Sequence, residues 1–162
     1  MLNFSFHNPT SIHFGSGQIE TIGSEIPADA KVLVVYGGGS IKNNGIFEQV
    51  VAALGDREWH EFSGIEPNPN YDTLIKALPI INDNNVDYLL AVGGGSVIDS
   101  TKFIAAAAKF EGGEPWDIIA KRAPVTQALP LGVVLTLPAT GSESNSSGVV
   151  TRNGNKLPFG HL

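Results

Sequence analysis

Three runs dominated by apolar residues, at 31–36, 87–92 and 132–136, predict strands buried on both faces of a sheet. None of these runs alternates apolar with polar positions, and continuous runs of this kind are typical of parallel sheets covered by helices on both sides. Residues 59–62 form a fourth, shorter candidate strand. The apolar pattern therefore predicts the interior of a parallel sheet.

Between the strands, apolar residues recur at the spacing that places them on one face of a helix. This spacing predicts helices over 19–26, 46–54, 71–81 and 97–108, with Pro79 kinking or ending the third of them. Strands that alternate with helices in this order predict an α/β fold. We expect a Rossmann-like parallel sheet with helices on both faces.

The remaining segments predict smaller elements. Residues 3–15 alternate and suggest two short strands, whereas 66–70 and 111–130 are rich in Pro and Gly and suggest loops. Residues 149–152 resemble a strand, and Asn-Gly within 153–155 is the signature of a type I′ hairpin turn.

Two identical Gly-Gly-Gly-Ser loops, at 37–40 and 93–96, follow two of the predicted strands and precede helical patterns. Glycine lets a ligand approach the backbone, and free N–H groups at a helix start attract phosphate. A single loop of this kind is as often structural as functional. Two of them at the carboxyl ends of parallel strands favour a dinucleotide, which has two regions to hold.

The loops match neither standard phosphate-binding signature. Ile98 and Lys42 occupy the sixth position, where the dinucleotide fingerprint has glycine, and neither loop ends in the Gly-Lys-Ser/Thr of a P-loop. The residues after Tyr36 include Lys42 and no acid, an environment that suits the 2′-phosphate of NADP(H). The alternative is that Ser40 only caps a helix and Lys42 is only a solvated charge.

Composition narrows the function classes. The net charge of −6 argues against nucleic acid as a partner. The absence of cysteine removes disulfides and thiolate chemistry. No apolar stretch spans a membrane and the N-terminus lacks a signal-peptide pattern, so we expect a cytoplasmic protein without a membrane partner. The four histidines show no metal-ligand spacing, and Ser142 lies outside a nucleophile-elbow motif.

Two further residues have both a structural and a functional interpretation. Asp99, in the first turn after the second glycine loop, either offsets the helix dipole or contacts the nicotinamide end of a cofactor. Lys156 is by its position alone a solvated lysine.

Four separated motifs, at 31–40, 66–69, 92–102 and 135–143, together resemble the iron-containing (group III) alcohol dehydrogenases. Within that family, the sequence is most similar to the branch of NADPH-dependent aldehyde reductases and butanol dehydrogenases. The resemblance implies an N-terminal cofactor-binding domain of the dehydroquinate synthase-like type. It also implies hydride transfer between NADP(H) and an aldehyde or primary alcohol in the full-length enzyme.

The resemblance assigns cofactor contacts to residues at the predicted strand ends. They are Gly37, Gly38, Gly39 and Ser40 for the adenosine 2′-phosphate end, Asn68 for the adenosine side, Gly94, Gly95 and Ser96 for the pyrophosphate, Asp99 for the nicotinamide, Thr136, Leu137 and Thr140 for the cofactor channel, and Lys156 for the nicotinamide ribose.

The family's divalent metal, iron or zinc, is held by one Asp and three His of a C-terminal helical domain. We expect residues 1–162 to be the NADP(H)-binding domain alone, without metal ligands or catalytic residues and inactive by itself. The predicted strands between Phe4 and Phe14 offer an edge for a homodimer. Two alternatives remain: an NAD-dependent relative of the glycerol dehydrogenases, or a non-catalytic nucleotide-binding fragment.

Overall fold

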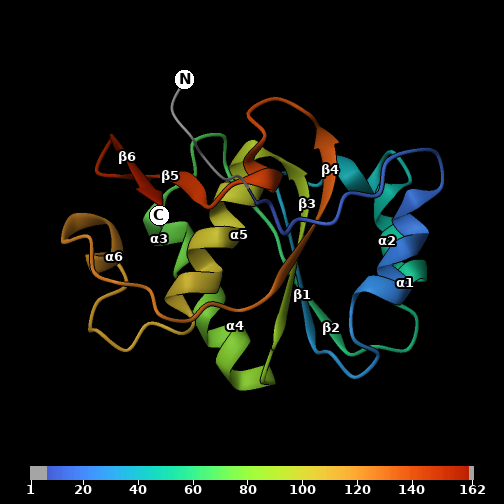
Figure 1. Ribbon diagram of the computed structural model, residues 1–162, viewed down its shortest axis with the longest axis horizontal. Coiled ribbons are helices and arrows are strands. Elements are labelled where there is room, and N and C mark those ends of the chain that lie inside the picture. The colour runs from blue at the N-terminus through green and yellow to red at the C-terminus, as the bar shows by residue number, and fades with distance from the viewer. Residues whose placement is uncertain (1–6, 161–162) are drawn as a thin grey trace.

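The computed structural model describes residues 7–160 and contains a four-stranded parallel sheet (Figure 1). The strand order is β2-β1-β3-β4, so the two strands that precede the glycine loops lie side by side at the centre. The predicted α/β class and parallel sheet are confirmed. The strands are β1 (Val32–Tyr36), β2 (Trp59–Phe62), β3 (Tyr88–Gly94) and β4 (Leu131–Leu137).

Helices cover both faces of the sheet, as predicted (Figure 1). Successive residues of β1 point to opposite faces, so Val34 enters one core and Leu33 and Val35 enter the other. One face carries η1 (Gln18–Thr21), α1 (Ile22–Glu25) and α2 (Ile46–Leu54), and the other carries α3 (Tyr71–Leu74), α4 (Ala77–Asn84), α5 (Gly95–Ala107) and α6 (Asp117–Ala120).

The helix predicted over 71–81 is divided into α3 and α4, and the break lies before Pro79 rather than at it. Pro79 is the third residue of α4, where the missing N–H would have no partner inside the helix in any case. The short segment 111–130, predicted as a loop, contains the single-turn helix α6.

Residues 147–160 form the predicted hairpin, with β5 (Ser147–Arg152) antiparallel to β6 (Asn155–Gly160). The backbone φ angles of Asn153 and Gly154 are 51° and 77°, and the positive sign at both central positions defines the type I′ turn. The hairpin packs on α5, where the Phe159 and Phe103 rings meet edge to face with centroids 5.8 Å apart.

The prediction of strands within 3–15 is wrong for residues 7–15, which form no strand. The Asn8 side chain instead accepts a hydrogen bond from the Thr10 amide, which makes a local turn around Pro9. The same side chain donates a hydrogen bond to the distant Ser144 carbonyl. Phe4 and Phe6 lie outside the described residues. Phe14 is 97% exposed, and the homodimer stays a prediction.

Candidate nucleotide-binding site

The carboxyl ends of the parallel strands gather the predicted cofactor residues at one edge of the sheet. Tyr36 pairs with Val92, so the first glycine loop begins beside the second. Gly94 pairs with Leu137, which places the end of β4 beside the second loop. In open α/β sheets, this edge is where ligands bind.

The first loop, residues 37–40, is open above its glycines. The Gly37 carbonyl accepts a hydrogen bond of 3.0 Å from the Gly64 amide, which brings the 63–70 segment alongside. A Cβ added at Gly38 or at Gly39 would meet nothing within 4 Å. The Ser40 hydroxyl is exposed and makes no hydrogen bond within residues 7–160. Backbone and hydroxyl are therefore accessible to a ligand.

The predicted helix over 46–54 is confirmed as α2 (Ile46–Leu54), but it does not begin at the first loop. Ser40 begins η2 (Ser40–Lys42), a single 3-10 turn, and α2 begins only at Ile46. The first loop therefore lacks a helix N-terminus that would supply a dipole and several free amides. Ser40 does not cap a helix by its side chain.

An acid is present beside the first loop, which corrects the sequence-based expectation of none. The Lys42 ammonium lies 2.6 Å from a Glu61 carboxylate oxygen, and the Tyr36 hydroxyl donates a hydrogen bond to the same oxygen. This pairing raises the pKa of Lys42 and lowers the pKa of Glu61. The sequence analysis missed Glu61, although it lies on the predicted strand 59–62, and pairing of that strand with 32–36 could have pointed to it.

The second loop is packed rather than open at its first glycine. A Cβ on Gly93 would lie 2.6 Å from a methyl group of Val97, so Gly93 is required for α5 to approach the sheet. The pairing of β3 with β4 shifts between Gly93 and Gly94, and Gly94 precedes α5 without a side chain that caps it. The first-turn amides of this 13-residue helix thus have no side-chain cap and no partner within the helix.

Residues 136–140 border the second loop. A Cβ on Gly95 would lie 3.0 Å from the Thr140 hydroxyl, so the backbone of Gly95 lies close to the β4 loop and a larger residue would displace the Thr140 side chain. Thr136, Leu137 and Thr140 are all exposed, and Leu137 is 66% exposed. The structure brings Leu137 beside Gly94 and Thr140 beside Gly95.

Asp99 is engaged by the chain itself. One carboxylate oxygen accepts a hydrogen bond of 2.6 Å from the Ser142 hydroxyl, and the other accepts from the Val149 amide at 3.0 Å. The described contacts thus give Asp99 a role in fixing residues 141–149 against α5. Its contact with the nicotinamide remains a prediction.

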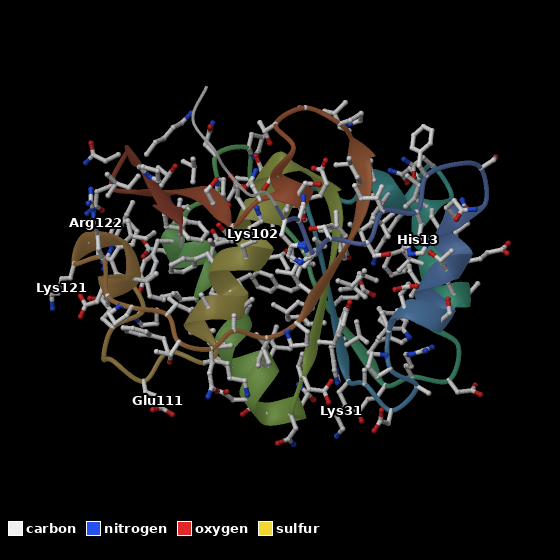
Figure 2. The ribbon with its side chains drawn as sticks, viewed as in Figure 1. His13, Lys31, Lys102, Glu111, Lys121 and Arg122 are labelled. Carbon is white, nitrogen blue, oxygen red and sulfur yellow. The ribbon has the colours of Figure 1, made fainter. Side chains whose placement is uncertain are left out.

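Lys102 completes this network and was missed by the sequence analysis. Its ammonium donates to the Ser142 hydroxyl at 2.8 Å, the Asn145 side chain at 3.1 Å and the Ser147 carbonyl at 2.8 Å. Figure 2 shows Lys102 at the centre of the molecule, whereas Lys121 projects from its periphery. Burial lowers the pKa of Lys102. Its position three residues after Asp99, on the same helix face, was the available signal.

The 66–70 loop connects the sheet edge to the hairpin. The Pro69 carbonyl accepts a hydrogen bond of 2.8 Å from the Thr151 amide, and Asn68 is exposed with a φ of 59°. Lys156 pairs with Thr151 from the opposite side of β5 and is exposed. No described contact joins Lys156 to the glycine loops, so its role stays a prediction.

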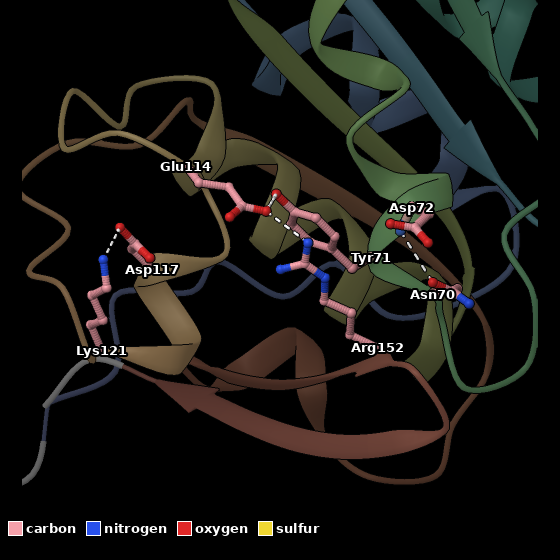
Figure 3. Close-up of polar contacts among 7 residues, drawn as sticks. All are labelled: Asn70, Tyr71, Asp72, Glu114, Asp117, Lys121 and Arg152. Atoms are coloured by element: carbon pink, nitrogen blue, oxygen red, sulfur yellow. Dashed lines mark hydrogen bonds and ion pairs between the residues drawn. The ribbon is translucent and has the colours of Figure 1, made fainter.

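Arg152 fastens the hairpin to the rest of the domain (Figure 3). Its guanidinium lies 4.5 Å from the Tyr71 ring centre and 5.0 Å from that of Trp116, and donates to Glu114 at 2.8 Å. The Tyr71 hydroxyl donates to the same Glu114 oxygen at 3.3 Å, and burial raises the pKa of Tyr71.

The described residues do not provide a metal site. Between residues 7 and 160, no three His, Cys, Asp or Glu side chains are grouped closely enough to hold an ion. The same part of the chain contains no helix with the length and apolar character needed to cross a membrane. A metal is therefore not assigned to these residues.

The four-stranded parallel sheet, with two glycine loops at its carboxyl edge and helices on both faces, defines an α/β protein of the open-sheet class. Residues 9–162 match the family described as "Iron-containing alcohol dehydrogenase", and the chain belongs to that family. The resemblance inferred from the four motifs is confirmed.

Among relatives, the chain is 51% identical to the NADPH-dependent aldehyde reductase YqhD of Escherichia coli, over 98% of this chain and 42% of that protein. It is 49% identical to the probable NADH-dependent butanol dehydrogenase 1 of Bacillus subtilis, over 99% of this chain and 42% of that protein. The crystal structure of Escherichia coli YqhD superposes with a TM-score of 0.94 at 50% identity, covering 99% of this chain and 42% of the other. The chain thus spans less than half the length of these relatives.

Proposed function

We propose that residues 1–162 form the NADP(H)-binding domain of a metal-dependent alcohol dehydrogenase or aldehyde reductase. In this proposal, the chain binds and orients the nucleotide for hydride transfer to or from an aldehyde or primary alcohol. The nicotinamide of the bound cofactor would carry the hydride. The similarity to an NADPH-dependent aldehyde reductase and to a probable NADH-dependent butanol dehydrogenase supports a nicotinamide cofactor.

One observation carries the proposal: the start of α5 is free of side-chain caps and faces the open end of β4. No side chain caps α5 at Gly94, and the positive end of a 13-residue helix favours an anion. The pyrophosphate is the part of a dinucleotide that fits this position. The open first loop lies beside it and suits the adenosine end.

The test is calorimetric titration of the chain with NADPH and, separately, with NADH. Binding rather than turnover is measured, because the described residues offer no donor set for the metal. We expect saturable binding of NADPH. Selective binding of NADH alone would support the glycerol dehydrogenase-like alternative, and binding of neither nucleotide would refute the proposal.

Matched glycine variants locate the site. Gly38→Val fills open space above the first loop and should weaken NADPH binding while the unfolding midpoint stays near that of the parent chain. Gly17→Asn is the control, because Gly17 also has open space around it but lies at the start of η1. If Gly38→Val and Gly17→Asn bind NADPH with equal affinity, the nucleotide does not bind at the first glycine loop.

A further inference from the structure

The carboxylate of Glu61 joins the two ends of the first glycine loop. Tyr36, immediately before the loop, and Lys42, in the turn after it, both donate to the same Glu61 oxygen. Glu61 lies on β2 opposite Val34 in the sheet register. It therefore reaches the loop from the neighbouring strand, on the face that α2 covers.

The Lys42 ammonium is held in place from several sides. It lies 4.5 Å from the centre of the Phe47 ring and 5.3 Å from that of Tyr36, in addition to its ion pair with Glu61. Its side chain is 43% exposed, so it is open to a ligand. Lys42 lies two residues after Ser40, on the same 3-10 turn.

A cation paired with a carboxylate attracts a phosphate less strongly than a free cation does, because the two charges largely cancel at the distance of the ligand. The carboxylate itself also repels a phosphate. The only difference between NADPH and NADH is the 2′-phosphate, so these two effects act on one cofactor and not on the other.

Resting on the function proposed above, we propose that Glu61 is a specificity-determining residue. By pairing with Lys42, it lowers the preference of the first loop for a 2′-phosphate and lets the loop accept NADH as well as NADPH. Relatives at 51% and 49% identity are named as NADPH-dependent and NADH-dependent, so both cofactors occur among proteins similar to this chain.

The test compares dissociation constants for NADPH and NADH in the parent chain and in Glu61→Gln, Lys42→Met and the double variant. Glu61→Gln should increase the preference for NADPH about two- to fivefold at low salt, the size expected of one exposed ion pair. Lys42→Met should shift the preference toward NADH, and the double variant should return near the parent. At about 1 M salt, where the screening length is about 3 Å, these shifts should shrink.

Glu58→Gln is the matched control. It removes the same charge from an ion pair with Lys31 at 3.2 Å, but it lies three residues earlier, about 10 Å along the chain toward the amino end of β2. Its cofactor preference should equal that of the parent chain.

Three results would overturn the inference. In the first, Glu61→Gln and Glu58→Gln have the same preference. In the second, Glu61→Gln weakens the binding of NADPH and of NADH by the same factor, which indicates a purely structural role for Glu61. In the third, the parent chain binds neither nucleotide, which refutes the proposed function as well. If the parent chain binds nucleotide but Glu61→Gln leaves the preference between NADPH and NADH unchanged, only the role of Glu61 is refuted and the proposed function stands.

Discussion

The two Gly-Gly-Gly-Ser loops have the same sequence and different surroundings. The second is packed: Gly93 contacts Val97, Gly95 approaches Thr140, and α5 begins directly within the loop. The first is open above Gly38 and Gly39 and continues into a 3-10 turn. A glycine loop therefore lies at the positive end of a helix dipole only where the helix begins within the loop, as α5 does and α2 does not.

The difference extends to the polar groups around each loop. The second loop is followed by a network in which Asp99 and Lys102 share Ser142 and hold residues 141–149. The first is bordered by the more exposed pair of Lys42 and Glu61. Under the proposed function, the second loop would hold the pyrophosphate and the first would distinguish NADPH from NADH.

The largest expected effect tests the packing difference. Gly93→Ala places a methyl group against Val97, whose branched Cβ cannot rotate away, and should lower the free energy of unfolding by about 1–3 kcal/mol. Gly38→Ala, in open space, should be neutral or stabilising by up to about 1 kcal/mol. Urea unfolding measures both. Equal destabilisation by the two variants would contradict the contrast between the loops.

The next effect tests the network behind the second loop. Lys102→Met removes three hydrogen bonds of a charged donor and should cost about 1–2 kcal/mol of unfolding free energy. Amide hydrogen exchange in residues 141–149 should accelerate. Lys121→Met removes an exposed pair with Asp117 and should change stability by less than about 0.5 kcal/mol. Unchanged exchange in the first variant would refute the role of Lys102.

A smaller effect tests the attachment of the hairpin. Arg152→Ala removes the stacking on Tyr71 and Trp116 and should destabilise the chain by about 1 kcal/mol. Arg152→Lys should recover only part of this loss, since an ammonium lacks the planar surface of the guanidinium. Urea unfolding followed by tryptophan fluorescence reports the change. Full recovery by lysine would mean that charge alone matters.

The smallest effect is the acid dependence of the first loop. The folded chain lowers the pKa of Glu61 from its ordinary 4.5, mainly through the hydrogen bond with Lys42. The pairing therefore stabilises the fold above pH 4.5 and is lost as the pH falls through the lowered value. The stability difference between the parent and Glu61→Gln should shrink below pH 4.5 in acid titrations of unfolding. In the Lys42→Met background, this pH dependence should weaken.

The sequence predicted the elements that depend on local patterns. The apolar runs located the strands, and Asn153-Gly154 specified the hairpin turn. Prediction from the sequence was less successful where contacts between distant residues decide the local structure. The break between α3 and α4 does not lie at Pro79, and residues 7–15 satisfy polar groups through Asn8 instead of strand pairing.

The same division applies to the site. The sequence by itself determined that two glycine loops follow two buried strands, because glycine content and apolar runs are local properties of the chain. The tertiary structure alone decided that Glu61 pairs with Lys42 and that Lys102 holds Ser142. These features join residues far apart in the sequence, and their contacts depend on strand order, register and packing.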